Sequence, residues 1–291
     1  FIETGLQDFS ISRLKEKMPW GVPVPNDPDQ VMYVWFDALV NYISTLGWPE
    51  DEQKFSAFWP GLQVAGKDNL RQQSAMWQAM LMSADLPNSA QIFIHGFITI
   101  GGRKMSKSVG NVISPFDLVQ KYGVDPVRYY LLREIPSGED GDFSYEKFEE
   151  RYNGDLANGI GNLVARVAAL GAKAGSFLRL QYDNQFLLVA DMTRIKNKYQ
   201  KHIESFRLNE ALGDIWEFIG IMDKWVNDEK PWTKEIKESQ AFIETAAHGL
   251  GEIAFLLDPF LPKTAQKIRE QIMIGDKEIT IKKGENLFPR L

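Results

Sequence analysis

Hydrophobic residues follow two different spacings along the chain, and the spacing changes at about residue 135. Before that point, short apolar runs rich in β-branched and aromatic residues alternate with longer stretches of helical spacing, which is typical of an α/β domain. The runs at 31–36, 62–65 and 91–97 predict strands, and 69–84 predicts a helix. Since strand, helix and strand follow one another from 62 to 97, we expect a right-handed crossover between parallel strands.

From about Tyr145 onward the apolar spacing becomes helical. Two stripes at intervals of three and four residues predict helices, and they consist of Leu156, Ile160, Leu163, Val167 and Leu170, and of Leu212, Ile215, Ile219, Met222 and Val226. Glycine or proline interrupts the pattern at 171–175, 230–231, 258–259 and 261–262. We therefore expect a bundle of antiparallel helices, connected to the first half by the turn-rich acidic segment 134–143.

Two carboxylates are expected near the carboxyl ends of predicted strands, where open α/β sheets bind ligands. Asp37 follows the first predicted strand, and Asp68 lies in the Gly66-Lys67-Asp68 run after the second. Such a carboxylate can accept a hydrogen bond from an α-ammonium group or a ribose hydroxyl. For Asp68 the N-cap of the following helix is an equally good interpretation.

Composition excludes several classes of protein. The chain has 291 residues, 44% of them hydrophobic, which suits about two folded domains and argues against disorder. With no cysteine and three widely separated histidines, it predicts neither a disulfide nor a zinc site. No apolar run has the length of a membrane span, so we expect a cytoplasmic protein without a membrane partner. A first residue of Phe1 suggests a fragment or a processed chain.

A net charge of −6 offers no bulk attraction for a polyanion, so any contact with nucleic acid must come from local basic patches. One candidate patch contains Arg103, Lys104 and Lys107. The other is the run 194–207, which holds Arg194, Lys196, Lys198, Lys201 and Arg207. The competing interpretation of this run is a solvated helix face.

The segment 101–108 (GGRKMSKS) directly follows a predicted strand. Adjacent glycines let a loop approach a phosphate closely, and two lysines three residues apart supply point charges. Nucleotidyl transfer requires such charges because negative charge builds on the phosphorus centre and on the departing pyrophosphate. Without further context, an exposed hairpin turn explains the two glycines equally well.

The string Lys104-Met105-Ser106-Lys107-Ser108 resembles the KMSKS signature of class I aminoacyl-tRNA synthetases. Its surroundings are similar to the methionyl-tRNA synthetase family, in the order of that family. The matching strings are DFSISR at 8–13, WGVPVPNDP at 20–28, YVWFDAL at 33–39, GKDNLR at 66–71, HGFITIGGRKMSKSVGNV at 95–112, DPVRYYLLR at 125–133 and NLFPRL at 286–291. The resemblance therefore covers nearly the whole chain.

The resemblance implies an ATP-dependent methionine–tRNA ligase, which forms methionyl adenylate and transfers the methionyl group to the 3′ end of its tRNA. Mg²⁺ accompanies the ATP in this family. Lys107 would hold the ATP phosphates in the transition state and Lys104 would assist as the second catalytic residue. The implied ATP-binding residues are Lys104, Met105, Ser106, Lys107, Ser108 and Asp68.

The resemblance also implies a methionine pocket with aromatic walls, which suit a thioether. The expected pocket residues are Trp35, Tyr42, Phe9, Gln73 and Asp37. For the aromatic residues, an ordinary place in the core is the alternative. The sequence departs from the family at Gln73, where a histidine is usual. Glutamine still donates and accepts a hydrogen bond, but it cannot carry a proton charge.

In the helical half, the resemblance implies anticodon contacts by Asn162, Arg166 and Trp232. Asn162 and Arg166 are four residues apart and so share one helix face, away from the apolar stripe. An aromatic ring can stack on an unpaired base while amide and guanidinium groups contact its edges. An ordinary surface position is the alternative for the Asn–Arg pair.

The second ATP-binding signature of class I synthetases, and the zinc-binding insertion of the family, are absent from this sequence. We therefore expect the second half of a Rossmann-like catalytic domain at 1–135, a connector at 136–150 and an anticodon-binding helical domain at 151–291. Such a fragment needs the missing N-terminal half as a partner and is expected to catalyse little alone. The alternatives are a synthetase for leucine, isoleucine, valine or cysteine, and a tRNA-binding module without activity.

Overall fold

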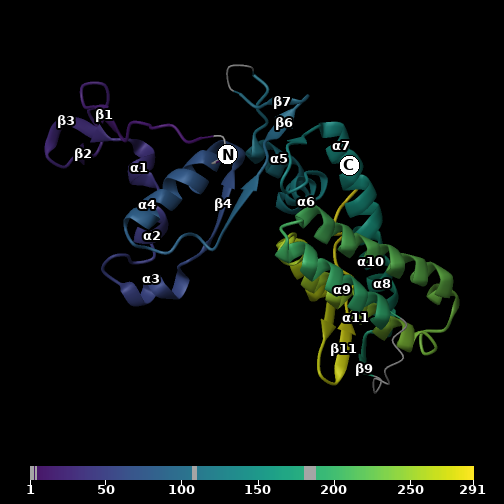
Figure 1. Ribbon diagram of the computed structural model, residues 1–291. Coiled ribbons are helices and arrows are strands. Elements are labelled where there is room, and N and C mark those ends of the chain that lie inside the picture. The colour runs from purple at the N-terminus through teal and green to yellow at the C-terminus, as the bar shows by residue number, and fades with distance from the viewer. Residues whose placement is uncertain (1–2, 4, 107–109, 180–187) are drawn as a thin grey trace. The chain divides into compact units, whose positions relative to one another are not determined.

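The computed structural model describes residues 3, 5–106, 110–179 and 188–291 (Figure 1). The chain divides into two compact units, Phe1–His95 and Gly96–Leu291. Each unit has a hydrophobic core of its own. The division falls before the change of spacing at residue 135, because the strands and helices between 96 and 135 pack with the helical part of the chain.

The first unit contains short strands and short helices. In chain order they are β1 (Ser12–Leu14), β2 (Pro23–Val24), β3 (Asp27–Met32), α1 (Val34–Ala38), α2 (Asn41–Ser44), α3 (Glu52–Phe58), β4 (Leu62–Gly66), η1 (Lys67–Asn69), η2 (Gln72–Met76), α4 (Trp77–Ser83) and β5 (Gln91–His95). Strands β1, β3 and β2 form a small antiparallel sheet, while β4 and β5 form a parallel pair.

The predicted parallel pairing of two strands joined by a helical segment is confirmed. β4 pairs with β5 in parallel, with Leu62 opposite Gln91 and Gly66 opposite His95, and η2 and α4 lie between them in sequence. On β4, Gln63 and Ala65 are buried, whereas the alternate residues Leu62 and Val64 are exposed. One face of this two-stranded sheet therefore presents apolar side chains to solvent.

The strand predicted at 31–36 is wrong beyond Met32. Val31 and Met32 end β3, and α1 begins at Val34 after Tyr33, whose backbone is extended. Trp35 and Leu39 are four residues apart and pack into the core of the unit, so packing favours a helix despite the β-branched and aromatic composition. As a result Asp37 lies on a helix, and its predicted position at a strand end is also wrong.

The second unit is mainly helical. Its elements are β6 (Ile98–Ile100), β7 (Arg103–Lys104), α5 (Pro115–Tyr122), α6 (Val124–Glu134), β8 (Gly141–Asp142), α7 (Tyr145–Arg151), η3 (Tyr152–Gly161), α8 (Asn162–Ala174), β9 (Ser176–Leu178), α9 (Val189–Glu204), α10 (Leu208–Glu229), η4 (Pro231–Thr233), α11 (Gln240–Leu257), α12 (Pro262–Gln271), β10 (Ile272–Ile274) and β11 (Glu278–Ile281). Both apolar stripes predicted from the sequence are buried in its core.

The helix ends predicted from glycine and proline positions are confirmed. α8 ends before Gly175, which has a φ of +65°, and α10 ends before Lys230, which has a φ of +45°. Pro231 and Pro262 each occupy the first position of a new helix, where the missing N–H has no cost. The helices are therefore separated by local backbone chemistry that is visible in the sequence.

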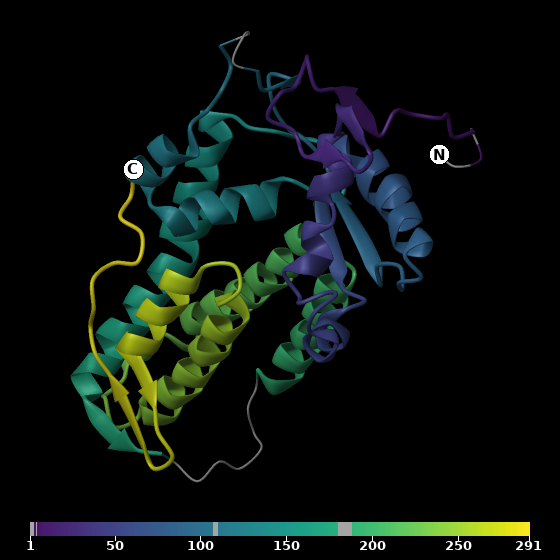
Figure 2. The same cartoon turned by 90° about the vertical axis from the view of Figure 1, so that its left-hand side faces the viewer.

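A small sheet at the end of the helical bundle was not predicted. Strands β10, β11 and β9 form it in that order, all antiparallel, and Ile279 of β11 is fully buried (Figures 1 and 2). The last strands follow α12 directly in sequence, while β9 follows α8. β10 and β11 are close in sequence, but β9 is distant from both, so its pairing with β11 depends on the packing of the helices between them.

Candidate functional sites

The glycines of the segment 101–108 form a tight hairpin turn. Strands β6 and β7 pair antiparallel across Gly101 and Gly102, whose φ angles are +59° and +71°. Positive φ at both central residues is what such two-residue turns require, and glycine adopts it without strain. The hairpin-turn interpretation is therefore right for the glycines.

Asp142 holds this hairpin from the neighbouring strand β8. Its Oδ1 accepts hydrogen bonds from the Gly102 N–H at 2.9 Å and from the Thr99 hydroxyl at 2.8 Å. The bond from Gly102, followed by that from Thr99, lowers the pKa of Asp142 below its ordinary value. The segment 134–143, expected only as a connection, thus contributes a strand and an acceptor that fix the turn.

Two residues after the turn, Lys104 and Ser106, form hydrogen bonds with the side chain of Asn111. The backbone N–H of Ser106 donates to Asn111 Oδ1 at 2.9 Å, and Asn111 Nδ2 donates to the Lys104 carbonyl at 3.4 Å. Lys104 is exposed, and its ammonium lies 4.1 Å from the centre of the Phe97 ring. Met105 and Ser106 are half-buried. Lys107 and Ser108 lie outside the described residues.

Unit Phe1–His95 contains an apolar pocket of about 420 Å³. Phe9, Phe36, Arg71 and Trp77 are among the residues that line it. Of the five predicted methionine-binding residues, Phe9 alone belongs to the lining, and it is half-exposed. The helices α2 and α4 and the segment around Phe9 therefore surround a space of the size typical of small-molecule sites, roughly 300–1,000 Å³.

Three further predicted residues lie in one cluster beside this pocket. Gln73 is buried, and its Nε2 donates to the Tyr42 hydroxyl at 2.8 Å. The Tyr42 ring lies 6.0 Å from the ring of Trp77, and Trp35 packs against the same core. Neither Gln73 Oε1 nor Trp77 Nε1 has a hydrogen-bond partner among the described residues. The structure thus adds Trp77, which lies one helical turn after Gln73, a spacing that could have revealed it.

The two predicted carboxylates are near members of this cluster in sequence, but they are exposed, whereas Gln73 is buried. Asp37 is exposed on α1, and Asp68 is exposed within η1, directly after β4. The N-cap of η1 is Gly66, which has no side chain, so Asp68 does not occupy a capping position there. The prediction that Asp68 lies at the carboxyl end of a strand is confirmed, whereas the roles of both residues stay predictions.

In the helical unit, Arg166 and Trp232 come together from distant parts of the chain. The guanidinium carbon of Arg166 lies 5.3 Å from the centre of the Trp232 ring. Arg166 donates to Asp223 Oδ1 at 2.8 Å and to Asn227 Oδ1 at 2.7 Å, and Asn227 Nδ2 donates to Asp223 Oδ2 at 3.1 Å. These two α10 residues, absent from the predicted set, fix the guanidinium over the ring.

The exposures of the trio fit a binding surface. Trp232 is 54% exposed, which is unusual for a large aromatic residue and leaves part of its ring open to a ligand. Asn162 is exposed at the start of α8, one turn before Arg166. A cation over one part of the ring and an open aromatic face suit a flat, unstacked base.

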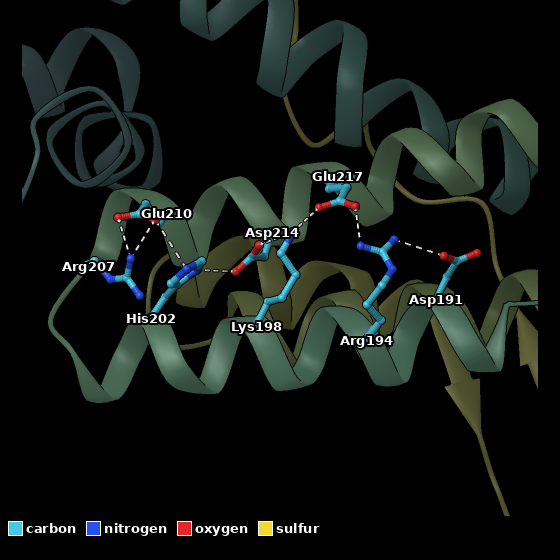
Figure 3. Close-up of polar contacts among 8 residues, drawn as sticks. All are labelled: Asp191, Arg194, Lys198, His202, Arg207, Glu210, Asp214 and Glu217. Atoms are coloured by element: carbon cyan, nitrogen blue, oxygen red, sulfur yellow. Dashed lines mark hydrogen bonds and ion pairs between the residues drawn. The ribbon is translucent and has the colours of Figure 1, made fainter.

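The basic run 194–207 forms an ion-pair ladder between α9 and α10 (Figure 3). From one end to the other, the ladder pairs Arg194 with Asp191 and Glu217, Lys198 with Glu217 and Asp214, His202 with Asp214 and Glu210, and Arg207 with Glu210. Lys196 pairs with Glu252. Acidic partners pair with Arg194, Lys196, Lys198 and Arg207, while Lys201 is exposed on α9. The helix-face interpretation is therefore right for this run, since most of its cations are paired.

No helix in the described part of the chain is long and apolar enough to cross a membrane. Among the same residues, no group of three or more His, Asp or Glu side chains is placed to hold a metal ion.

Comparison with known proteins defines the class. The family model described as tRNA synthetases class I (M) matches residues 1–168, which include the hairpin and the first turns of α8. The chain therefore belongs to the class I tRNA synthetases. Since this match covers more than half of the chain, the resemblance inferred from the KMSKS string is confirmed.

The similar proteins are named methionine–tRNA ligase or methionyl-tRNA synthetase. The chain is 38% identical to a methionine–tRNA ligase of Bacillus subtilis and 40% identical to one of Clostridium acetobutylicum, in each case over 100% of the chain and about half of the relative (48% and 49%). A crystal structure of methionyl-tRNA synthetase from Mycobacterium tuberculosis bound by methionyl-adenylate matches with 34% identity and a TM-score of 0.89. That match covers 99% of this chain and 62% of the other.

Proposed function

We propose that the chain is part of a methionine–tRNA ligase and contributes its signature loop, part of its methionine pocket and its anticodon-binding bundle. The chain spans about half the length of the curated relatives it matches. The proposed reaction has two steps. A methionine carboxylate oxygen attacks the α-phosphorus of ATP and pyrophosphate leaves; a hydroxyl at the 3′ end of tRNA(Met) then attacks the methionyl carbonyl and AMP leaves.

One observation carries the proposal. The KMSKS segment begins on a hairpin that Asp142 and Asn111 hold, in a chain that is similar to methionine–tRNA ligases over its whole length. A fixed hairpin base holds the strand that carries Lys104, and preorganised charges stabilise the developing charge of a transition state better than mobile ones do. Lys104 and Lys107 are the proposed catalytic residues, and they act on the phosphates of ATP.

The remaining ATP contacts are proposed for Met105, Ser106 and Ser108 in the same loop, and for Asp68 at the end of β4. Mg²⁺ would arrive with the nucleotide, because this ion is usually held by phosphates and water together with one or two carboxylates. Its chemistry is the neutralisation of charge on the phosphates. We propose that the enzyme works in the cytoplasm.

For methionine, we propose that Trp35, Tyr42 and Trp77 form aromatic walls, with Phe9 at the rim of the adjoining pocket. Aromatic rings make favourable contacts with a thioether sulfur, worth about 0.3–1.5 kcal/mol each. The unsatisfied Gln73 Oε1 supports a polar contact from a ligand in this place. Asp37 is the proposed acceptor for the α-ammonium group.

For tRNA(Met), we propose that Trp232 stacks on an unpaired anticodon base and that Arg166 and Asn162 contact base edges. The fixed guanidinium beside the exposed ring supports this role. The proposed catalytic part is 1–135, the connector 136–150 and the anticodon-binding domain 151–291. These functional bounds differ from the division into compact units at His95, which reflects packing alone.

We further propose that the missing N-terminal half supplies a strand beside β4. Within the described residues, β4 pairs with β5 alone. Its other edge and the exposed Leu62 and Val64 are typical of a sheet that continues in another segment.

Methionine-dependent ATP–pyrophosphate exchange tests the proposal. We would measure it for residues 1–291 alone and after mixing with the part of the Bacillus subtilis ligase that this chain does not match. The matching part of that ligase is 38% identical to this chain. Exchange in the mixture, and its loss with Lys107→Ala, supports the ligase. A folded chain that binds tRNA(Met) and gives no exchange in either sample would favour the second candidate, a tRNA-binding module without activity.

A further inference from the structure

Trp232 lines two hollows of different chemistry in the helical unit. One, the Arg166 hollow, has a volume of about 300 Å³ and is lined by Arg166, Val226 and Phe242 among others. The second, the lysine hollow, has a volume of about 440 Å³ and is lined by Lys173, Lys234, Glu235, Ile236 and Lys237 together with shared residues. Trp232, Leu170 and Lys173 line both hollows.

The Arg166 hollow suits a base. Its walls are mainly apolar, and Phe242, which lines it, stacks on Trp225 at a centroid distance of 4.3 Å. The guanidinium of Arg166 is the polar group fixed at its rim by Asp223 and Asn227. Such a hollow can exclude water from a flat aromatic group while offering donors to its edge.

The lysine hollow has an excess of positive charge. Lys234 is paired with Glu229 at 2.9 Å, so its charge is largely compensated. Lys173 and Lys237 are exposed, and neither forms an ion pair with another residue in the described part of the chain. The acidic group in the lining is Glu235. Two uncompensated ammonium groups against one carboxylate leave the hollow attractive for an anion.

We propose that the lysine hollow binds the phosphodiester group next to the base that stacks on Trp232, with Lys173 and Lys237 supplying the charge. This inference rests on the proposed anticodon-binding function. The occupant is single-stranded RNA, because an exposed aromatic ring that lines both an apolar hollow and a cationic one matches the alternation of base and phosphate along a strand. Lys173 lines both hollows, so it lies where backbone and base of one nucleotide meet.

Phosphate contacts and base contacts leave different signatures. Each phosphate that a lysine neutralises on a single strand adds about 0.7 to the slope of log K against log salt concentration. Lys173→Gln and Lys237→Gln should each remove up to about 0.7 of that slope and weaken binding about threefold at low salt, equally for any loop sequence. Glu235→Gln should act in the opposite direction and tighten binding.

The experiment measures fluorescence anisotropy of a labelled RNA hairpin bound to the full chain, at several salt concentrations. One hairpin carries CAU, the complement of the methionine codon, in its loop, and a second carries a single changed base. Lys267→Gln is the matched control, because Lys267 is an exposed lysine of α12 outside both hollows. Circular dichroism confirms that each variant is folded.

The outcomes distinguish the proposed phosphate site from the proposed anticodon-binding function. If wild type prefers CAU and Trp232→Ala loses that preference, but both lysine variants match Lys267→Gln in slope, the phosphate site is wrong and the anticodon-binding function stands. If wild type binds both hairpins equally, the anticodon-binding function and the phosphate site are both wrong. A polyglutamate peptide that competes with the RNA, and binds the Trp232→Ala variant equally well, would identify an acidic protein partner instead and overturn the inference.

Discussion

At the residue scale, single polar contacts decide how the proposed sites are held. Asp142 accepts from both the turn and the strand of the signature hairpin, although it comes from a segment expected to be only a connection. Gln73 ties a buried position on η2 to Tyr42 on α2. Each contact joins residues more than thirty positions apart, so neither spacing nor composition could reveal its partner.

The hydrogen bond from Gly102 predicts a pH dependence for Asp142→Asn. Because the folded pKa of Asp142 is lowered from its ordinary value of 3.8, its carboxylate stabilises the fold at pH values above that ordinary value. This contribution is lost as pH falls through the folded pKa. The variant should therefore unfold at a lower temperature than wild type near neutral pH. The difference should narrow as pH falls below about 4 and vanish below the lowered folded pKa. Thermal unfolding from neutral to acid pH checks this. A constant difference across that range would contradict it.

Gln73 and Trp77 should respond very differently to truncation. Gln73→Leu removes one hydrogen bond but also an unsatisfied buried oxygen, and these effects oppose each other, so we expect a change under about 1 kcal/mol in the free energy of unfolding. Trp77→Ala leaves a cavity at a side chain that is 1% exposed and should cost about 3–5 kcal/mol. Urea unfolding measures both. A loss above about 2 kcal/mol for Gln73→Leu would show that its oxygen has a partner.

At the element scale, α10 organises the helical unit on two sides. Toward α9 it supplies three carboxylates of the ion-pair ladder, Glu210, Asp214 and Glu217 (Figure 3). Near its end Asp223 and Asn227 hold Arg166. The ladder is mostly exposed, but Asp214 is an exception with an exposure of 4%. The basic run that the sequence left as either a nucleic-acid patch or a solvated helix face thus forms ion pairs between helices.

Two carboxylates of the ladder differ in burial, so their substitutions should differ in their effect on the free energy of unfolding. Asp214 is buried and accepts from His202 Nδ1 at 2.6 Å and pairs with Lys198 at 3.2 Å, so Asp214→Ala should cost about 1.5–3 kcal/mol. Glu217 is partly exposed, so Glu217→Gln should cost less than about 1 kcal/mol and lose its effect at high salt. Urea unfolding at low and high salt distinguishes them. Equal costs would mean that burial does not set the strength of these pairs.

At the scale of the whole molecule, the two hydrophobic cores share no residue. The core of Phe1–His95 gathers around Trp77, Leu39 and Leu81, whereas that of Gly96–Leu291 extends through α6 to α12 and includes β11. The first unit is small and leaves an apolar face of β4 exposed. Its stability is expected to depend on a further segment more than that of the second unit.

Separate cores predict that the second unit folds by itself. Residues 96–291 expressed alone should unfold cooperatively, with a urea midpoint equal to that of the more stable transition in the full chain. Circular dichroism at 222 nm measures both. Loss of the cooperative transition in the shorter chain would show that residues 1–95 complete its core.

Much of the fold was predictable because local signals agreed with packing. The crossover from β4 to β5, the two buried helical stripes and the helix ends at Gly175, Lys230 and Pro262 follow from periodicity and backbone restrictions. The prediction was wrong at 34–36, where β propensity favoured a strand. A helix forms there because Trp35 and Leu39, four residues apart, pack into one core. The three-stranded sheet of β9, β10 and β11 was missed because short strands carry little signal.

The sequence by itself determined the family, the KMSKS segment and the residue types of the candidate sites, since these depend on residue identity and order alone. Only the tertiary structure decided which partners those residues have. It placed Asp142 against Gly102, Asp223 against Arg166 and acidic partners against the run 194–207. The physical reason is that a charge or a hydrogen-bonding group acts over a few ångströms in space, and contacts between distant segments exist only after the hydrophobic cores have formed.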